Sequence, residues 1–225
     1  MVVTSQETWE SCGASLVIGS GAADWAADDR SALTLADEML PSGQALVLTP
    51  APGDRGSGIV SRRSIRDVRF ARRGPEGRHT TLLHRPPTAQ ALNLVPHPEG
   101  GWFTETWRAS VTLTPPGYPS ERSAATAILF LLPPDEASRW HVVSSDELWF
   151  WHSGGPLALA LGGTGDRPQD QRTVILGPDL AQGQTPQALV PGQTWQSARP
   201  LSGETLVSCV VSPGFDFADF RILPR

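Results

Sequence analysis

Cysteine is scarce in this sequence, which contains Cys12 and Cys209 and no others. A lone, distant pair gives no CxxC motif and no zinc-ligand spacing, and it is weak evidence for a disulfide. Long apolar runs are also missing: nothing approaches the roughly 18 consecutive apolar residues of a membrane helix, and no basic segment followed by an apolar run opens the chain. We therefore expect a soluble cytoplasmic protein with two unpaired thiols and no membrane partner.

Charge is the second shortage, since charged residues make up 18% of the chain and the net charge is −5. A protein that tracks phosphates needs a basic surface, so we expect no nucleic-acid partner. The basic residues do gather in one segment, where they fit either a solvated strand face or a contact with an acidic partner or another subunit. They are Arg55, Arg62, Arg63, Arg66, Arg69, Arg72, Arg73 and Arg78.

Turn-forming residues are abundant, with 22 glycines and 21 prolines, and they separate short alternating runs from Leu92 onward. This pattern, with almost no helix, predicts an all-β sandwich or closed barrel. We expect strands at Gly101–Trp107, Ser110–Thr114, Ala125–Leu132, Ser138–Val143, Glu147–His152, Leu157–Leu161, Gln171–Leu176, Gln187–Val190, Thr194–Ala198, Thr205–Val211 and Phe217–Ile222. A barrel of this size holds side chains or one small ligand.

The sequence pattern of the first part of the chain differs from that of the rest, and two prolines in Arg85–Thr88 mark the expected boundary. We expect an N-terminal extension over residues 1–87 and the barrel over residues 88–225. Within the extension, the sequence predicts strands at Ala14–Ile18 and Ala45–Leu48, a short helix within Ala22–Met39, and a β-hairpin formed by Ser61–Arg72 and His79–His84.

The stretch from Ser138 to Gly155 is the strongest candidate for the functional site. It places His141 and Glu147 on two short strands around a turn at Ser144–Ser145. Alternate residues of a strand face the same side, so both side chains can point into one cavity, with Trp149 and Trp151 on the same face as Glu147. An imidazole and a carboxylate brought together in this way fit a divalent-metal site or an acid–base pair.

Strand parity assigns the neighbouring candidates less definitely. His152 has the opposite parity to Glu147, so we expect it to face outward. In Gly101–Arg108, residues 102, 104, 106 and 108 share one face and residues 103, 105 and 107 share the other, and parity alone does not say which face is inner. Glu105 therefore fits either a pocket acid or a surface ion pair.

Several blocks of the chain resemble, in order, those of the Cupin_5 family of the cupin superfamily. They are LNLVPHPEGGWFTETWR, ERSAATAILFLL, SRWHVVSSDELWFWHSGGPLAL, LGPDLAQGQTPQALVPGQTWQSAR and CVVSPGFDFADF. The resemblance covers roughly residues 90–223 and implies a double-stranded β-helix, or jelly roll. Relative to the general cupin metal pattern, His141 and Glu147 are retained, Val143 replaces a second histidine and Gln196 replaces a third. The resemblance thus implies His141, Glu147 and Gln196 as metal ligands.

The resemblance also implies a function and partners. We expect a small-molecule enzyme, a divalent-metal-dependent oxygenase acting on a small amino acid, thiol or carboxylic acid. Iron(II) is the first choice of metal, nickel, manganese, copper or zinc are alternatives, and no organic cofactor is expected. His141 and Glu147 would be catalytic, and the expected substrate contacts are Glu105, Arg108, Trp149, Trp151 and His97. Cupins usually dimerise, which implies a homodimer.

Two other functions remain open. One is metal-free acid–base catalysis, as in sugar-nucleotide epimerases that share the barrel, with His141 as base and a tyrosine as acid. The single tyrosine, Tyr118, lies outside the strand blocks, which counts against it. The other is a binding protein without turnover, because fold alone does not decide function.

Overall fold

The computed structural model describes residues 14–18, 68–73, 79–83, 85–118, 120–169 and 172–223. The chain divides between Pro98 and Glu99 into two compact units. In the first unit, β1 (Ala14–Ile18), β2 (Val68–Arg73) and β3 (His79–Leu83) form one antiparallel sheet in that order. The strand predicted at Ala14–Ile18 and the pairing of the predicted hairpin are therefore confirmed. The helix predicted within Ala22–Met39 and the strand predicted at Ala45–Leu48 lie outside the described residues.

The first unit also contains α3 (Pro87–Ala91) and β4 (Val95–Pro96). Proline at the first helical position is favourable because its missing N–H would have no partner there. Arg85 donates from Nη2 to the side chain of Asn93 at 3.0 Å, and Gln90 donates to the Arg85 carbonyl at 3.3 Å. The expected boundary segment is thus a short helical turn tied to its own flanks.

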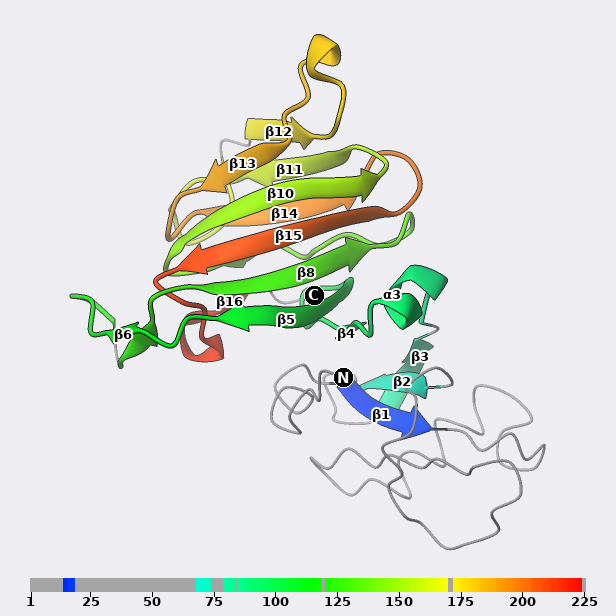
Figure 1. The fold of residues 1–225 in the computed structure, drawn as a ribbon, viewed down its shortest axis with the longest axis horizontal. Helices are drawn as coiled ribbons and strands as arrows, with labels where there is room; N and C mark the ends of the chain where they lie inside the picture. The colour runs from blue at the N-terminus through cyan, green and yellow to red at the C-terminus, as the bar shows by residue number, and fades with distance from the viewer. Residues whose placement is uncertain are drawn as a thin grey trace, which may run out of the picture. The chain divides into compact units, whose positions relative to one another are not determined.

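The second unit is built of antiparallel strands in two main sheets, which confirms the predicted all-β class. The first sheet has the order β13-β10-β15-β8-β5, and the second has the order β12-β11-β14-β9-β16. Figure 1 looks onto the first sheet, with the second sheet behind it. The strands are β5 (Trp102–Arg108), β6 (Thr112–Leu113), β7 (Arg122–Ser123), β8 (Thr126–Leu132), β9 (His141–Val142), β10 (Asp146–Gly154), β11 (Leu157–Leu161), β12 (Arg172–Leu176), β13 (Gln187–Val190), β14 (Trp195–Pro200), β15 (Thr205–Ser212) and β16 (Arg221–Ile222).

The strands expected at Ser110–Thr114 and Ser138–Val143 are reduced to the two residues of β6 and of β9. Two further features differ from the sequence prediction. The strand expected over Phe217–Ile222 is a single 3-10 turn, η3 (Phe217–Asp219), followed by the two residues of β16. Asp216 causes the change, because its side chain accepts a hydrogen bond from Ala218 N at 2.8 Å and so caps the turn. The second difference is β7, which the sequence did not predict and which pairs with β6. A further 3-10 turn, η2 (Leu180–Gln182), precedes β13.

Cross-strand register defines which side chains lie between the two sheets. Trp149, Cys209 and Ile128 are directly opposite one another on β10, β15 and β8, and they share one face. Trp149 donates a hydrogen bond to Gln196 of the second sheet, so this face is the inner one. The apolar core there is densely filled, since Phe130 and Trp149 pack edge to face with ring centroids 5.9 Å apart.

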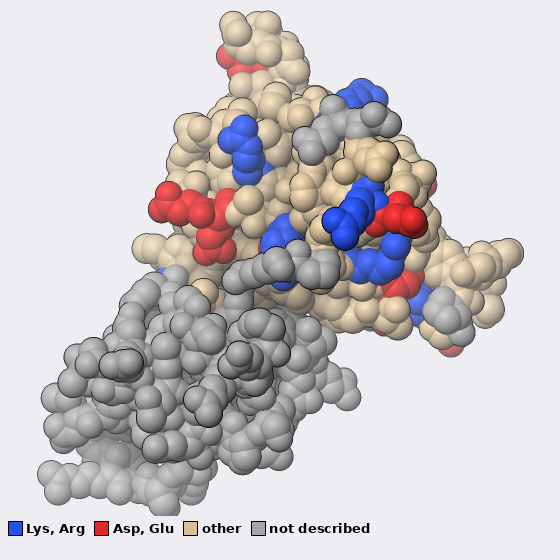
Figure 2. Space-filling model, turned by 180° about the vertical axis from the view of Figure 1, so that it is seen from behind, with Lys and Arg blue, Asp and Glu red and all other residues tan. Residues whose placement is uncertain are grey.

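Neither basic nor acidic residues dominate the composition, and the surface agrees with this. On the face shown in Figure 2, basic and acidic side chains lie interspersed over the described part of the surface. In the part of the chain that the structure describes, no helix has the length and apolar character needed to cross a membrane.

Candidate functional site

The turn between His141 and Glu147 joins the two sheets. β9, which carries His141, pairs with β14 and β16 of the second sheet, whereas β10, which carries Glu147, belongs to the first. The predicted strand–turn–strand is therefore a crossover, and its two side chains come from different sheets. His141 is 2% exposed and Glu147 is 6% exposed. The burial of both side chains agrees with the prediction that they point inward.

His141 is held by two oxygen atoms on one side of its ring. Its Nδ1 lies 2.8 Å from the Arg139 carbonyl oxygen and 3.1 Å from Oε2 of Glu99. A carbonyl oxygen can only accept, so Nδ1 carries the hydrogen. In the neutral ring, Nε2 then carries the lone pair, and it is the atom through which His141 can accept a proton or bind a metal.

Glu99 is placed by the two glycines that follow it. Gly100 has φ +115° and Gly101 has φ +70°, a region that residues with a Cβ rarely adopt. A Cβ on Gly100 would lie 2.6 Å from the Ala137 carbonyl oxygen, and one on Gly101 would lie 2.8 Å from that of Leu131. The backbone is also tied across this turn, since Arg139 N donates to the Glu99 carbonyl at 2.8 Å. The glycine pair thus lets the chain turn closely enough to set Glu99 beside His141.

Glu147 is held by donors from both sheets. Gln196 Nε2 donates to Oε2 of Glu147 at 2.6 Å, and the Cys209 thiol also hydrogen-bonds to this carboxyl group. The other atom of the amide, Gln196 Oε1, accepts a hydrogen bond from Trp149 Nε1 at 3.0 Å. Gln196 is fully buried, so both ends of its amide need these partners.

Burial sets the protonation states of this cluster. Burial lowers the pKa of His141 to about 4, although its hydrogen bond to the Arg139 carbonyl acts in the opposite direction. Burial raises the pKa of Glu147 to about 7, against the hydrogen bonds from Gln196 and Cys209, which lower it. Near neutral pH, His141 is therefore neutral and the Glu147 carboxyl exists in both forms.

Burial shifts the pKa of the two remaining members of the cluster in the same direction. Burial, followed by the charge on Glu147, raises the pKa of Glu99 well above its ordinary value. Burial also raises the pKa of the Cys209 thiol, and the charges on Glu147 and Glu99 and the hydrogen bond to Glu147 add to the effect. In both groups the protonated, neutral form is favoured over the charged form.

A divalent metal fits this arrangement poorly. Metal sites in proteins use about three or more ligating side chains. Across the described ranges, no group of three or more His, Cys, Asp and Glu side chains is arranged to hold a metal ion. The third ligand implied by the resemblance, Gln196, already uses its oxygen for Trp149 and its nitrogen for Glu147. The structure thus joins Gln196 to Glu147, while His141 is held by Arg139 and Glu99. The role of His141, Glu147 and Gln196 as metal ligands stays a prediction.

The other predicted residues are distributed around the barrel. Trp149 lies in the cluster, while Trp151 is half-buried and donates from Nε1 to the Gly155 carbonyl at 3.1 Å. His152 is exposed and hydrogen-bonds to Ser208, as its opposite parity predicts. His97 is buried in the first unit, and its role as a substrate contact stays a prediction.

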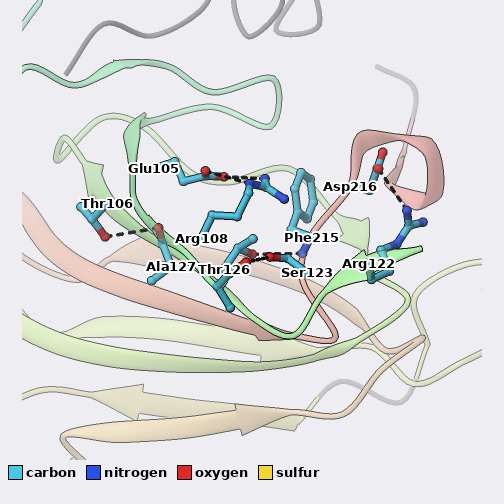
Figure 3. A network of polar contacts seen from close by, with 10 residues as sticks. Glu105, Thr106, Arg108, Arg122, Ser123, Thr126, Ala127, Phe215 and Asp216 are labelled. Atoms are coloured by element: carbon cyan, nitrogen blue, oxygen red, sulfur yellow. Dashed lines mark hydrogen bonds and ion pairs between the residues drawn. The ribbon is translucent and has the colours of Figure 1, made fainter. Parts of the chain in front are cut away.

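Glu105 and Arg108 form an ion pair with each other, shown in Figure 3. Arg108 donates to the two carboxylate oxygens of Glu105 at 3.0 and 2.6 Å, and the side chains are 49% and 40% exposed respectively. A bulge between Glu105 and Trp107 breaks the simple alternation on which parity depends. Both side chains are thus paired outside the buried cluster, and their contact with substrate stays a prediction.

Sequence reasoning missed Glu99 and Cys209. Cys209 falls on the inner parity of the correctly predicted strand Thr205–Val211, so parity offered a signal. Glu99 lies in a loop before its strand, where parity does not apply. The adjacent Gly100–Gly101 pair was the available signal, because it marks a close backbone approach.

Comparison with known proteins agrees with the fold. A hypothetical protein from Leishmania major is 36% identical, with 60% of this chain and 84% of that chain covered and a TM-score of 0.55. A protein from Shewanella oneidensis is 34% identical, with 60% and 82% covered and a TM-score of 0.55. Among curated proteins, none matches. The sequence profile of Cupin_5, described as cupin superfamily (DUF985), matches residues 87–223, and the chain belongs to this family with its double-stranded β-helix barrel.

Proposed function

We propose that the barrel is a small-molecule enzyme that works by metal-free acid–base chemistry, with Glu147 as the group that exchanges a proton with the substrate. The observation that carries this proposal is the burial of Glu147 between hydrogen-bond donors from both sheets, Gln196 and Cys209. A carboxyl group with a pKa of about 7 is close to the optimum for a general acid or base near neutral pH. The substrate class is a small amino acid, thiol or carboxylic acid.

His141 has a supporting role in this proposal. A pKa of about 4 makes it a weak base near neutral pH, although the sequence suggested it as the base of an epimerase-like reaction. Its Nδ1–H is fixed by the Arg139 carbonyl and Glu99, so Nε2 offers an oriented acceptor. We infer that His141 accepts a hydrogen bond from the substrate and orients it toward Glu147.

The metal-dependent oxygenase remains the second candidate, and one observation favours it. Metal-ligating histidines usually donate their other ring N–H to a carbonyl or carboxylate, as His141 does. The engaged amide of Gln196 and the valine at position 143 leave this histidine without the usual partners. We therefore rank acid–base chemistry first.

Metal content separates the two candidates. We expect the purified protein, after incubation with iron(II), nickel, copper, manganese or zinc and removal of free metal, to retain well under one equivalent of each. Elemental analysis measures it, with His141→Ala and Glu147→Ala as paired variants. One equivalent of a metal in the wild type that disappears in both variants would favour the oxygenase over acid–base catalysis.

The homodimer also belongs to this proposal, and the outer face of the first sheet is the surface that suits it. One row of side chains crosses its strands β5, β8, β15, β10 and β13 and is apolar throughout: Trp107, Ala127, Val210, Leu148 and Leu189. Its two ends are half exposed, Trp107 at 51% and Leu189 at 52%. An apolar stripe of this kind can pack on its copy across a two-fold axis.

Light scattering tests the dimer. We expect the wild type to have twice the mass of the chain, and Leu189→Glu to be monomeric because it buries a charge in the proposed interface. Leu201→Glu is the control, since Leu201 is also exposed, at 45%, but lies outside the row. A monomeric wild type, or a Leu189→Glu variant that stays dimeric, would contradict the proposed interface.

A further inference from the structure

The side chains of the buried cluster are almost completely removed from solvent. His141, Glu147 and Glu99 are 2%, 6% and 5% exposed. The walls around them are long ladders, such as β10 with β15, which pair from Asp146 and Ser212 to Gly154 and Thr205. Separating such strands breaks many hydrogen bonds, so local opening is expected first where the backbone has few of them.

The segment in contact with His141 has irregular backbone. The ring of Phe220 lies against the imidazole of His141, with centroids 5.6 Å apart and planes inclined by 39°. Phe220 follows the single turn of η3, and the two-residue β16 that comes next pairs with β9. Phe220 also packs on Phe215 and Phe217, with ring centroids 5.8 and 5.9 Å away. The cover is thus an aromatic cluster on irregular backbone.

Both ends of this segment are fastened to the barrel. At its start, Gly214 N donates to the Ser123 carbonyl at 2.8 Å and Phe215 N donates to Thr126 Oγ1 at 3.0 Å, the second of which appears in Figure 3. At its end, Leu223 N donates to the Trp140 carbonyl at 2.8 Å. Residues 216–220 lie between these two points of attachment.

Arg122 holds the middle of the segment closed. Its side chain is 2% exposed and donates from Nη1 to Asp216 at 3.0 Å, while Nη2 lies 3.4 Å from Asp219. Nη1 also donates to Ser120 Oγ at 2.7 Å, so the guanidinium is fixed from the barrel side. Asp216 itself is 47% exposed, which means that water can replace its half of the pair when the segment moves.

We propose that residues 216–220 form a gate over the site, in which Phe220 is the moving cover of His141 and the ion pairs of Arg122 are its latch. The gate would serve the enzyme proposed above and so rests on that function for its purpose. The movement proposed for the gate concerns only the access of solvent and reagents to His141. It can therefore be tested without a substrate.

Chemical modification of His141 measures the gate directly. Diethyl pyrocarbonate modifies accessible neutral imidazoles, and mass spectrometry of the His141 peptide gives the rate. We expect Phe220→Ala to raise the rate at His141 by about tenfold or more, because the cover is lost, and Arg122→Gln to raise it through loss of the latch. His152, which is exposed, serves as the internal standard and should react equally in every variant.

Phe150→Ala is the matched control. Phe150 lies on the outer face of β10, so its truncation loosens the barrel without uncovering His141. An equal rise in Phe150→Ala, or a rate in Phe220→Ala within about twofold of the wild type, would overturn the gate. Where Phe220→Ala is too unstable to study, Phe220→Leu keeps an apolar side chain and tests the same contact.

Hydrogen exchange of the wild type provides a measurement without substitutions. The amides of Asp219 and Phe220 donate within the turn, to Asp216 and Phe217. A gate requires them to exchange faster than the amides of β15, and equal protection would overturn it. If the gate is confirmed but the acid–base chemistry is not, the gate controls access to a site with another reaction. If the acid–base chemistry is confirmed but the gate is not, the substrate reaches Glu147 by another route.

Discussion

Replacing Glu147 by glutamine should stabilise the protein, relative to the wild type, by an amount that grows as the pH rises. The pKa of Glu147 is about 7 in the folded chain and 4.5 is its ordinary value, so between these pH values the folded state keeps a proton that the unfolded state has lost. Wild-type stability therefore falls as the pH rises through this window. The difference of 2.5 pKa units corresponds to about 3 kcal/mol, which the glutamine variant does not lose.

His141→Gln should show the opposite slope. The pKa of His141 is about 4 in the folded chain against an ordinary 6.5, so between these values the unfolded state binds a proton that the folded state does not. Wild-type stability therefore falls as the pH drops from 6.5 to 4. The variant avoids this loss, and its stability relative to the wild type should rise by about 3 kcal/mol over the same interval.

Urea unfolding at a series of pH values measures both slopes. In the wild type, between pH 4.5 and 6.5, Glu147 lowers the free energy of unfolding as the pH rises and His141 raises it. The two contributions cancel in part, so each pH dependence is seen only when the other group is removed. Glu121→Gln, at an exposed position, controls for the loss of one negative charge. Parallel pH curves for the wild type and both variants would show that the two side chains are not buried as a cluster.

Strand periodicity predicted much of the barrel. The strands Leu157–Leu161 and Gln187–Val190 have the bounds expected from the sequence, because apolar alternation and flanking turn residues define them locally. The inward direction of His141 and Glu147 followed from the same alternation. What periodicity could not show is that the turn between them passes from one sheet to the other, since sheet membership depends on pairing with strands distant in the chain.

The rest of the site depends on contacts that have no local signal. Glu99 reaches His141 through the close turn at Gly100–Gly101, and Gln196 reaches Glu147 across the barrel. The metal-ligand role implied for Gln196 followed from its position in the cupin pattern. That role stays a prediction, and the hydrogen bonds of the amide to Trp149 and Glu147 are contacts that only the packed interior reveals.

Proton exchange with solvent is the second large effect that we expect. When the Glu147 carboxylate takes a proton from a carbon next to a carboxyl or carbonyl group, the C–H bond breaks and Glu147 becomes protonated. In D2O the proton on Glu147 is replaced by a deuteron, and its return to carbon converts C–H to C–D. The compounds to test are α-amino acids, 2-hydroxy acids and 2-oxo acids.

Three variants separate chemistry from structure in this experiment. Glu147→Gln keeps an oxygen that can accept from Gln196 but cannot take up a proton, and we expect exchange to fall by at least about 100-fold. His141→Gln should lower the rate through loss of the oriented acceptor at Nε2. His152→Gln changes an exposed histidine on the outer side of β10, the strand that carries Glu147, and should leave the rate unchanged.

The measurement that tests the central claim most directly is this exchange, followed by proton NMR in D2O after treatment of the protein with a chelator. The acid–base account predicts that the wild type replaces the carbon-bound hydrogen of at least one of these compounds, that chelation does not change the rate, and that Glu147→Gln abolishes it. Exchange that survives in Glu147→Gln would contradict the account. So would the lack of any exchange with a compound that the protein binds, which would leave the barrel as a binding protein.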